Sequence, residues 1–265
     1  MHKKKKLPVG KITQCLFSGS ADHFGTFMAR NGLSKYHDKN APVVLFGLRL
    51  QSKVEKLMMH KGLAIVVYRG SDVRHLRKLT KELKKPNIKH VAISSFISDD
   101  LAEFGIEHKV IPLVGSDVSC MTGPLKPLGN TVYVYCPLTH TAVYGGNLIR
   151  RIKRKIPFKV NIVTSSEMHT REELASVYNN SFIGLRLTTH DGIANQVVEM
   201  GLRGIRVVHN GMQPNAIPWK NMHGIVRSIQ AESRRIGTIN QDVADAMKRY
   251  IDVGTDWLYE RYWND

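Results

Sequence analysis

One stretch of this sequence, Ser181-Phe-Ile-Gly-Leu-Arg-Leu-Thr-Thr-His-Asp-Gly-Ile-Ala-Asn-Gln-Val-Val-Glu-Met-Gly201, predicts a strand, a polar loop and a helix in immediate succession. Residues 182–187 form a largely apolar run, which predicts a buried strand. The polar residues 188–192 follow as a loop, and the helix is expected to begin near Gly192. This order is the building unit of proteins with parallel sheets and crossover helices.

Two carboxylates belong to this predicted helix. Asp191 and Glu199 are eight residues apart, so one is expected at the helix N-terminus and the other about two turns on, near the same face. A helix N-terminus has free backbone N–H groups and a partial positive charge, so it can hold a phosphate. Glu199 can then accept hydrogen bonds from ribose hydroxyls. The stretch therefore predicts a nucleotide site at the carboxyl end of a strand.

Strand and helix patterns alternate along the rest of the chain, which predicts parallel sheets. Strands are expected at residues 12–17, 43–46, 64–68, 90–93 and 109–111, then 132–136, 159–163, 182–187 and 205–208. Helices are expected at residues 22–31, 52–60, 72–83, 98–104, 143–155, 171–178, 193–202 and 224–234, with a last helix at about 240–262. Pro124, Pro127 and Gly129 mark a linker. We therefore expect two domains, residues 1–128 and 129–265.

The composition suits a globular protein. The chain has 265 residues, 42% hydrophobic and 23% charged, which is enough for one large or two small domains. Its three cysteines, Cys15, Cys120 and Cys136, lack metal-site spacing and are expected to be buried thiols in a reducing compartment. No apolar run is long enough to cross a bilayer, and Pro8 and Gly10 interrupt the segment after the lysine run 3–6. A cytoplasmic location is expected, with peripheral membrane contact left open.

The order of these pieces resembles the glycosyltransferases of family 4, which have the GT-B fold. The acidic pair followed by Gly201, Gly204 and the strand 205–209 is similar to the donor-binding signature of that family, although the family more often has Glu where Asp191 stands. Residues 91–105 and 110–117 resemble the end of its first domain. Residues 132–136, followed by Tyr144-Gly-Gly146, resemble the first strand and phosphate loop of its second domain. The aromatic C-terminal tail resembles its closing helix, which returns to the first domain.

The resemblance implies a fold, a reaction and a set of residues. The fold is α/β, with two Rossmann-like doubly wound domains facing a cleft: the first binds the acceptor and the second binds a nucleotide sugar. The reaction is glycosyl transfer with retained configuration. The catalytic residues are expected to be Asp191, His190 and Arg69, where Arg69 replaces the His that the family often has after the third strand. The donor-binding residues are expected to be Gly19, His140, Tyr144, Gly145, Arg186, Gly192 and Glu199.

The residues also bear on metal and cofactor use. No Asp-x-Asp sequence and no His/Cys cluster occurs, so no metal site is expected. A metal-independent mechanism would rely on helix N-termini and arginines to stabilise the diphosphate leaving group. Arg186 is the best candidate cation, since no lysine follows the strand 159–163. No cofactor is expected beyond the nucleotide-sugar co-substrate.

The charge is strongly basic and uneven. The net charge is +17, with 22 basic and 10 acidic residues in 1–128, against 17 and 12 in 129–265. A basic acceptor domain attracts polyanions such as DNA or an anionic membrane surface, but it can also be a solvated surface. The resemblance implies a glycan, lipid-linked or small-molecule acceptor, and the basic charge keeps a modified DNA base as an alternative. An inactive nucleotide- or polyanion-binding module, or another enzyme class on this fold such as a sugar-nucleotide epimerase, stays open. The sequence predicts no oligomeric state.

Overall fold

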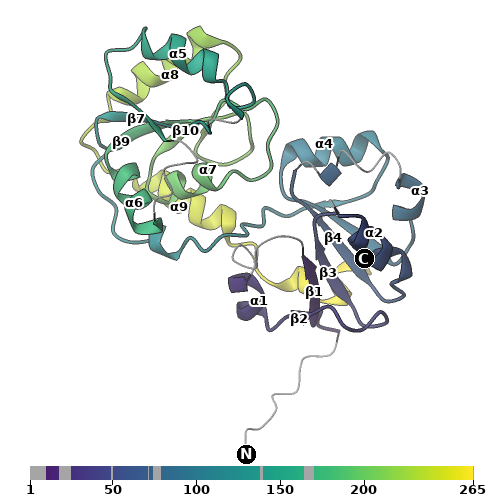
Figure 1. Ribbon diagram of the computed structural model, residues 1–265. Helices are drawn as coiled ribbons and strands as arrows, with labels where there is room; N and C mark the ends of the chain where they lie inside the picture. Colours follow the sequence, from purple (N-terminus) through teal and green to yellow (C-terminus); the bar gives the residue numbers. More distant parts are fainter. Residues whose placement is uncertain are drawn as a thin grey trace, which may run out of the picture. The chain divides into compact units, whose positions relative to one another are not determined.

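The structure is a computed structural model that describes residues 10–17, 25–48, 50–70, 72–73, 79–137, 140–163 and 170–264. The predicted donor residue Gly19 lies outside these ranges. The chain divides into two compact units, each with its own sheet (Figure 1). Unit 1 runs to Ser116 and also takes the C-terminal segment from Val253, and unit 2 is Asp117–Asp252. These bounds differ from the predicted division at residue 128.

The sheet of unit 1 has six strands in the order β2-β1-β3-β4-β5-β6. Their bounds are β1 Gln14–Phe17, β2 Ser34–Lys35, β3 Val43–Phe46, β4 Ala64–Tyr68, β5 Ile88–Ala92 and β6 Lys109–Val110. All five pairings in this sheet are parallel. Every residue of β3 and β4 is buried, as expected of strands covered by helices on both faces. The predicted parallel α/β class is confirmed here.

Four helices of unit 1 are described: α1 Gly25–Asn31, α2 Gln51–Met59, α3 Thr80–Leu83 and α4 Ser95–Glu103. Helix α4 begins where it does because the side chain of Ser94 accepts a hydrogen bond from the Ile97 backbone N–H. The predicted helix 72–83 is described as helix only over α3, and residues 74–78 of that prediction lie outside the described ranges.

The sheet of unit 2 has five strands in the order β11-β10-β9-β7-β8, again with parallel pairings. Their bounds are β7 Thr131–Tyr135, β8 Val160–Val163, β9 Ser181–Leu185, β10 Arg206–Val208 and β11 Ala216–Ile217. The first strand of each sheet lies between its second and third strands. This is the doubly wound order in which the chain reverses direction across the sheet, and ligands bind at that reversal.

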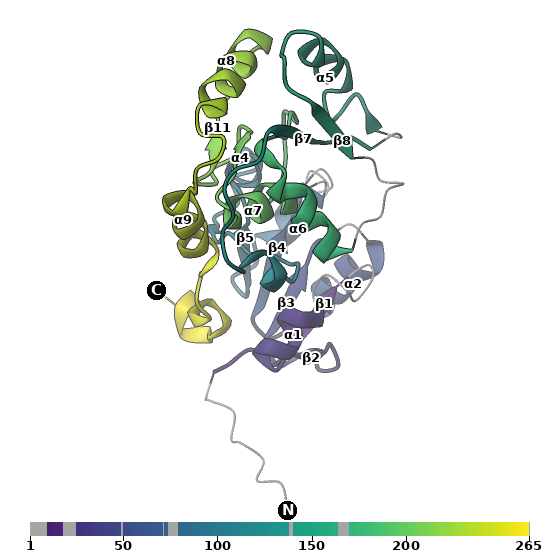
Figure 2. The ribbon, with the colours of Figure 1, turned by 90° about the vertical axis from the view of Figure 1, so that its left-hand side faces the viewer.

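Helices cover both faces of the unit 2 sheet. Their bounds are α5 Gly146–Lys153, α6 Arg171–Asn179, α7 Asn195–Leu202, α8 Met222–Ser233 and α9 Gln241–Ile251. Both views show α5 and α8 on one side of the strands and α6, α7 and α9 on the other (Figures 1 and 2). Helix α6 begins with a reciprocal cap, in which Thr170 and Glu173 each accept the other's backbone N–H.

The boundary between the units lies upstream of the predicted linker, because the linker packs against unit 2. The 3₁₀ turn Ser119–Met121 packs against α6 and α7, and Met121 is fully buried. Leu128 exchanges backbone hydrogen bonds with Gly237 and Thr238, both at 2.9 Å. The segment with the two prolines therefore belongs to unit 2.

The last predicted helix is wrong in length. Helix α9 ends at Ile251, and Gly254 follows with a left-handed φ of +62°. Two 3₁₀ turns, Asp256–Leu258 and Glu260–Trp263, then complete unit 1. The Ile12 backbone N–H donates to the Leu258 carbonyl at 2.8 Å. The tail thus returns to unit 1, as the resemblance implied, but not as a helix.

Two further findings concern the thiols and the helices. Cys15 and Cys136 are buried, Cys120 is half-buried, and none of the three forms a disulfide. No helix within the described ranges is long and apolar enough to span a membrane.

Candidate functional site

The loops that carry most of the predicted donor residues meet at one edge of the unit 2 sheet. Strands β7 and β9 are adjacent and parallel, so their carboxyl ends lie together. The loop after β7 carries His140, Tyr144 and Gly145, and the loop after β9 carries residues 186–194. This is the reversal point of the sheet, where α/β proteins of this order bind their ligands. We call it the donor edge.

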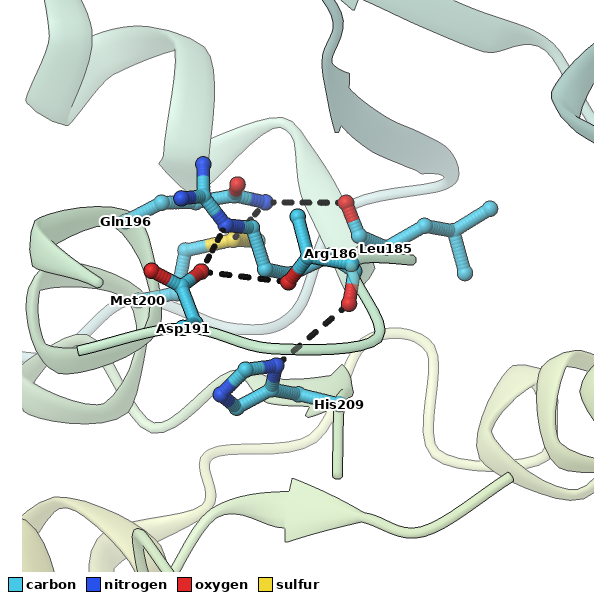
Figure 3. Close-up of polar contacts among 7 residues, drawn as sticks. Leu185, Arg186, Asp191, Gln196, Met200 and His209 are labelled. Atoms are coloured by element: carbon cyan, nitrogen blue, oxygen red, sulfur yellow. Dashed lines mark hydrogen bonds and ion pairs between the residues drawn. The ribbon is translucent and has the colours of Figure 1, made fainter. Parts of the chain in front are cut away.

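An ion pair organises the loop after β9 (Figure 3). Arg186 Nε donates to Asp191 Oδ2 at 2.7 Å, and Thr188 Oγ1 donates to the same oxygen at 3.1 Å. The Arg186 and Asp191 side chains are 11% and 15% exposed. Burial lowers the pKa of Arg186, but the charge and hydrogen bond of Asp191 outweigh it and raise that pKa overall. Arg186 therefore stays protonated, with its charge paired to the Asp191 carboxylate.

The predicted start of the helix after β9 is wrong. Helix α7 begins at Asn195, after the N-cap residue Ala194, which makes no side-chain cap. Asp191 and Gly192 consequently lie in the loop. Asp191 is held by Arg186 and Thr188, so its carboxylate is part of the loop and not of the first helical turn.

An aromatic side chain connects the two loops of the donor edge. The Arg186 guanidinium carbon lies 4.6 Å from the centre of the Tyr144 ring, within cation–π range. The Tyr144 ring in turn meets Tyr135 edge-on, with ring centroids 5.5 Å apart. The structure thus brings together Tyr144, Arg186 and Asp191, three residues that the sequence predicted for this site.

Gly145 is the N-cap of α5 and requires the absence of a side chain. Its φ is +72°, and a Cβ added to it would lie 3.0 Å from the Leu187 Cβ. The loop after β7 can therefore approach the end of β9 closely. The N-terminus of α5 directs the positive end of its dipole to the donor edge, while the N–H groups of Gly145 and Gly146 donate to the carbonyls of Ala142 and Thr141 at 3.2 and 2.7 Å.

Glu199 lies on a buried side of α7. It is 3% exposed, and its Oε2 accepts a hydrogen bond of 2.8 Å from the hydroxyl of Tyr178. The Tyr178 ring is itself 1% exposed and meets the Tyr133 ring edge-on. Glu199 therefore holds the Tyr178 hydroxyl inside unit 2.

His209 follows β10 and joins the donor edge, although the sequence analysis did not single it out. It is fully buried, and its Nδ1 lies 3.4 Å from the Arg186 carbonyl oxygen (Figure 3). Burial lowers its pKa, partly offset by the charge of Asp191. In the sequence, His209 could have been found as the first polar residue after an apolar strand.

The corresponding edge of unit 1 carries the predicted residue Arg69. The backbone N–H groups of Arg69 and Gly70 donate to the Asp72 carboxylate, at 2.8 Å for Gly70 to Oδ1. Asp72 is 5% exposed, and burial raises its pKa against the opposing effect of these hydrogen bonds. Asp72 therefore fixes the conformation of the half-exposed loop after β4, which carries Arg69 and Gly70.

A buried lysine, Lys53, lies at the same edge of unit 1 and was not predicted. It is 2% exposed, and its Nζ donates to the carbonyls of Phe46 and Gly47, the latter at 3.0 Å. Burial lowers its pKa to about 8, with Asp72 raising it and Arg69 lowering it. Lysine in the first turn of a helix opposes the helix dipole, and this was the signal in the sequence.

The remaining predicted residues are placed as follows. His140 is exposed, His190 is half-buried and Gly192 is buried, all in the loops of the donor edge. Arg69 belongs to unit 1 and Asp191 to unit 2. Within the described ranges, no three His, Cys, Asp or Glu side chains gather closely enough to hold a metal ion.

The sequence has no match among protein-family models or curated proteins. Solved structures match in fold. Sucrose-phosphate synthase from Thermosynechococcus elongatus has a TM-score of 0.61 at 10% identity, covering 91% of this chain and 74% of that one. TarM has a TM-score of 0.59 at 8% identity, covering 86% of this chain and 55% of TarM. A mutant of S. aureus TarM, in complex with fondaparinux, alpha-GlcNAc-glycerol and UDP, has a TM-score of 0.53 at 8% identity, covering 86% and 56%.

These neighbours are glycosyltransferases of the GT-B type. At such low identity the likeness shows the fold, and it confirms the predicted α/β class with Rossmann-like parallel sheets. The chain spans about half the length of TarM. The facing arrangement of the two domains stays a prediction.

Proposed function

We propose that this protein is a glycosyltransferase that takes a nucleotide sugar at the donor edge of unit 2. One observation carries the proposal: Arg186, fixed by Asp191, and the N-terminus of α5 lie at the reversal point of the sheet. A diphosphate is stabilised by a cation and by the positive end of a helix, and in this proposal Arg186 and α5 supply these. The neighbours in fold are glycosyltransferases of the GT-B type, which supports the same conclusion.

In this proposal each residue has a role that follows from its place. Arg186 and the positive end of the α5 dipole stabilise the diphosphate as it leaves. Asp191 and His190, in the half-exposed part of the loop after β9, contact the sugar. Glu199 contacts the ribose while it holds Tyr178. Configuration is retained without a metal ion, as in family 4, which the signature around Asp191 resembles.

The acceptor side of the proposal concerns unit 1. The TarM complex contains UDP together with alpha-GlcNAc-glycerol, a nucleotide and a sugar-bearing alcohol. We propose a comparable pair for this chain: a nucleotide-sugar donor and a glycan, lipid-linked or small hydroxyl acceptor, with Arg69 near the reacting groups. A modified base in DNA is the other acceptor class that the basic charge of the first half favours.

The test is a ligand screen by thermal unfolding. A ligand at 100 times its Kd stabilises the native state by about 2.7 kcal/mol, so at least one nucleoside diphosphate sugar should raise the Tm. Arg186→Met should abolish that rise. Arg234→Met is the matched control, because Arg234 is an exposed arginine at the C-terminal end of α8.

Activity is then measured with the stabilising sugar nucleotide. Hydrolysis of the nucleotide sugar without acceptor should be slow in the wild-type protein and lost in Asp191→Asn. Binding without hydrolysis or transfer would instead establish an inactive nucleotide-binding module. If no nucleotide or nucleotide sugar shifts the Tm of the wild-type protein, the proposed donor site is wrong.

A further inference from the structure

Unit 1 contains a cavity at the sheet edge opposite its predicted acceptor side. The cavity has a volume of about 690 Å³ and is lined by residues that precede or begin β5 and β6, with Trp263 from the C-terminal segment. All pairings in the sheet are parallel, so the amino ends of its strands share one edge. Arg69 and Lys53 lie at the carboxyl ends. We call the new feature the amino-edge cavity.

The lining of the amino-edge cavity is strongly basic. Lys84, Lys85, Lys89 and Lys109 all line it, against one acidic residue, Glu107. Within the described residues, Lys84, Lys85 and Lys89 form no ion pair. Lys109 donates to the Tyr262 carbonyl at 2.9 Å and lies 4.1 Å from the centre of that residue's ring.

Backbone carbonyls hold both histidines of the cavity. His90 Nε2 donates to the Leu83 carbonyl at 3.0 Å, so its Nδ1 accepts the hydroxyl of Tyr68. Burial lowers the pKa of His90 to about 4, and it is neutral near pH 7. His108 Nδ1 donates in the same way to the Ile106 carbonyl at 2.8 Å. His90 therefore adds no positive charge to that of the four lysines.

Helix polarity accounts for only part of this cluster. Lysines are favoured near helix C-termini, and Lys84 is the C-cap residue of α3. Lys89 and Lys109 belong to strands β5 and β6, where no such preference applies. Four like charges around one concave site raise each other's energy, and a bound anion removes that cost.

We propose that the amino-edge cavity binds a phosphate-bearing ligand, held by Lys84, Lys85, Lys89 and Lys109. Its volume is within the range of small-molecule sites. Ile88, Ile106 and Trp263, each at most 6% exposed, form an apolar wall for the rest of the ligand. This site is independent of the donor edge, which belongs to unit 2. Four of the basic residues of the first half would then serve this cavity and not the acceptor side.

Two sources carry this chemistry: a soluble phosphate compound and the headgroup of an anionic phospholipid. The first probe is inorganic pyrophosphate, titrated by calorimetry into full-length protein. The donor edge can also take pyrophosphate, so the titration uses the Arg186→Met background. The second probe is vesicle co-sedimentation with phosphatidylglycerol in phosphatidylcholine, against phosphatidylcholine alone.

The variant is Lys84→Gln with Lys89→Gln, and the control is Lys153→Gln with Arg154→Gln, which removes the same charge from the exposed end of α5. We expect the variant to weaken pyrophosphate binding, or vesicle binding, at least about tenfold, equivalent to about 1.4 kcal/mol. The control should bind like its parent. Selective loss with pyrophosphate indicates a soluble ligand, and selective loss with vesicles alone indicates a lipid headgroup.

Two results would overturn the proposal: no binding of either probe at about 0.1 M salt, or equal weakening in the variant and the control. Folding is checked by the Tm without probe, which should be unchanged because Lys84 is exposed and Lys89 is half-buried. If the double variant is unstable, Lys85→Gln alone replaces it, with Lys153→Gln as its control. Because unit 2 is not involved, failure here leaves the proposed donor site intact.

Discussion

Replacing Lys53 with methionine should change how the stability of the protein depends on pH. The Lys53 ammonium is 2% exposed and donates to two backbone carbonyls at the end of β3. Burial lowers its pKa from 10.5 to about 8 in the folded state. The unfolded chain exposes the lysine and restores the ordinary value.

The sign follows from proton binding. Between pH 8 and 10.5 the unfolded state holds the Lys53 proton while the folded state has largely lost it. The free energy of unfolding therefore rises with pH in that window and is flat well below it. With these two pKa values, the rise between pH 7.5 and pH 9 is about 1 kcal/mol. The Lys53→Met variant lacks this titrating group, so its unfolding free energy does not show this rise.

The measurement is urea denaturation of both proteins at several pH values between 7.5 and 9. The difference in unfolding free energy, wild type minus Lys53→Met, should grow by about 1 kcal/mol across this range. Cys15, whose pKa burial raises to about 12, lowers stability at high pH in both proteins and cancels in the difference. Lys56→Met, an exposed lysine of the same helix, is the control and should keep the wild-type pH dependence. A difference that stays flat or shrinks with pH would refute the reasoning.

Three other substitutions test the packing around the site. Gly145→Val should cost roughly 1–3 kcal/mol in urea denaturation, because φ is +72° and a Cβ would lie 3.0 Å from the Leu187 Cβ; an unchanged midpoint would contradict this. Tyr178→Phe removes the 2.8 Å hydrogen bond to the buried Glu199 carboxylate and should cost about 1.5–3 kcal/mol, and a loss below about 0.5 kcal/mol would show that Glu199 is otherwise satisfied. Ser94→Ala removes the cap of α4 and should cost about 1 kcal/mol, most of which Ser94→Asp should restore.

The order of strands and helices was predictable because parallel strands are buried on both faces. Such strands appear in a sequence as short apolar runs, and β3, β4 and β7 follow the predicted runs closely. The residues of the donor edge were predictable on other grounds. The resemblance to family 4 pointed to Tyr144 and Asp191, and Arg186 was the candidate cation on the predicted strand. The parallel order of β7 and β9 brings the three together.

Local sequence failed where a residue had two possible partners. Asp191 can cap a helix or pair with a cation, and only the folded loop shows that it pairs with Arg186. The helix consequently begins later, at Asn195. The predicted linker fails similarly, because prolines mark a bend whether or not the bend is packed. The burial of Met121 against α6 and α7 decides that it is packed.

The sequence by itself determined the parallel α/β class, the order of the elements and the loops in which the candidate donor residues lie, because these follow from short-range hydrophobic patterns and turn residues. Only the tertiary structure decided which titratable groups are buried. Lys53 and His209 have shifted pKa values because distant segments exclude water from them. The resemblance implied the return of the C-terminal tail to unit 1, but only the tertiary structure decided the form of that return. It rests on backbone hydrogen bonds such as Ile12 to Leu258, between residues almost at opposite ends of the chain, and no local pattern specifies such a pairing.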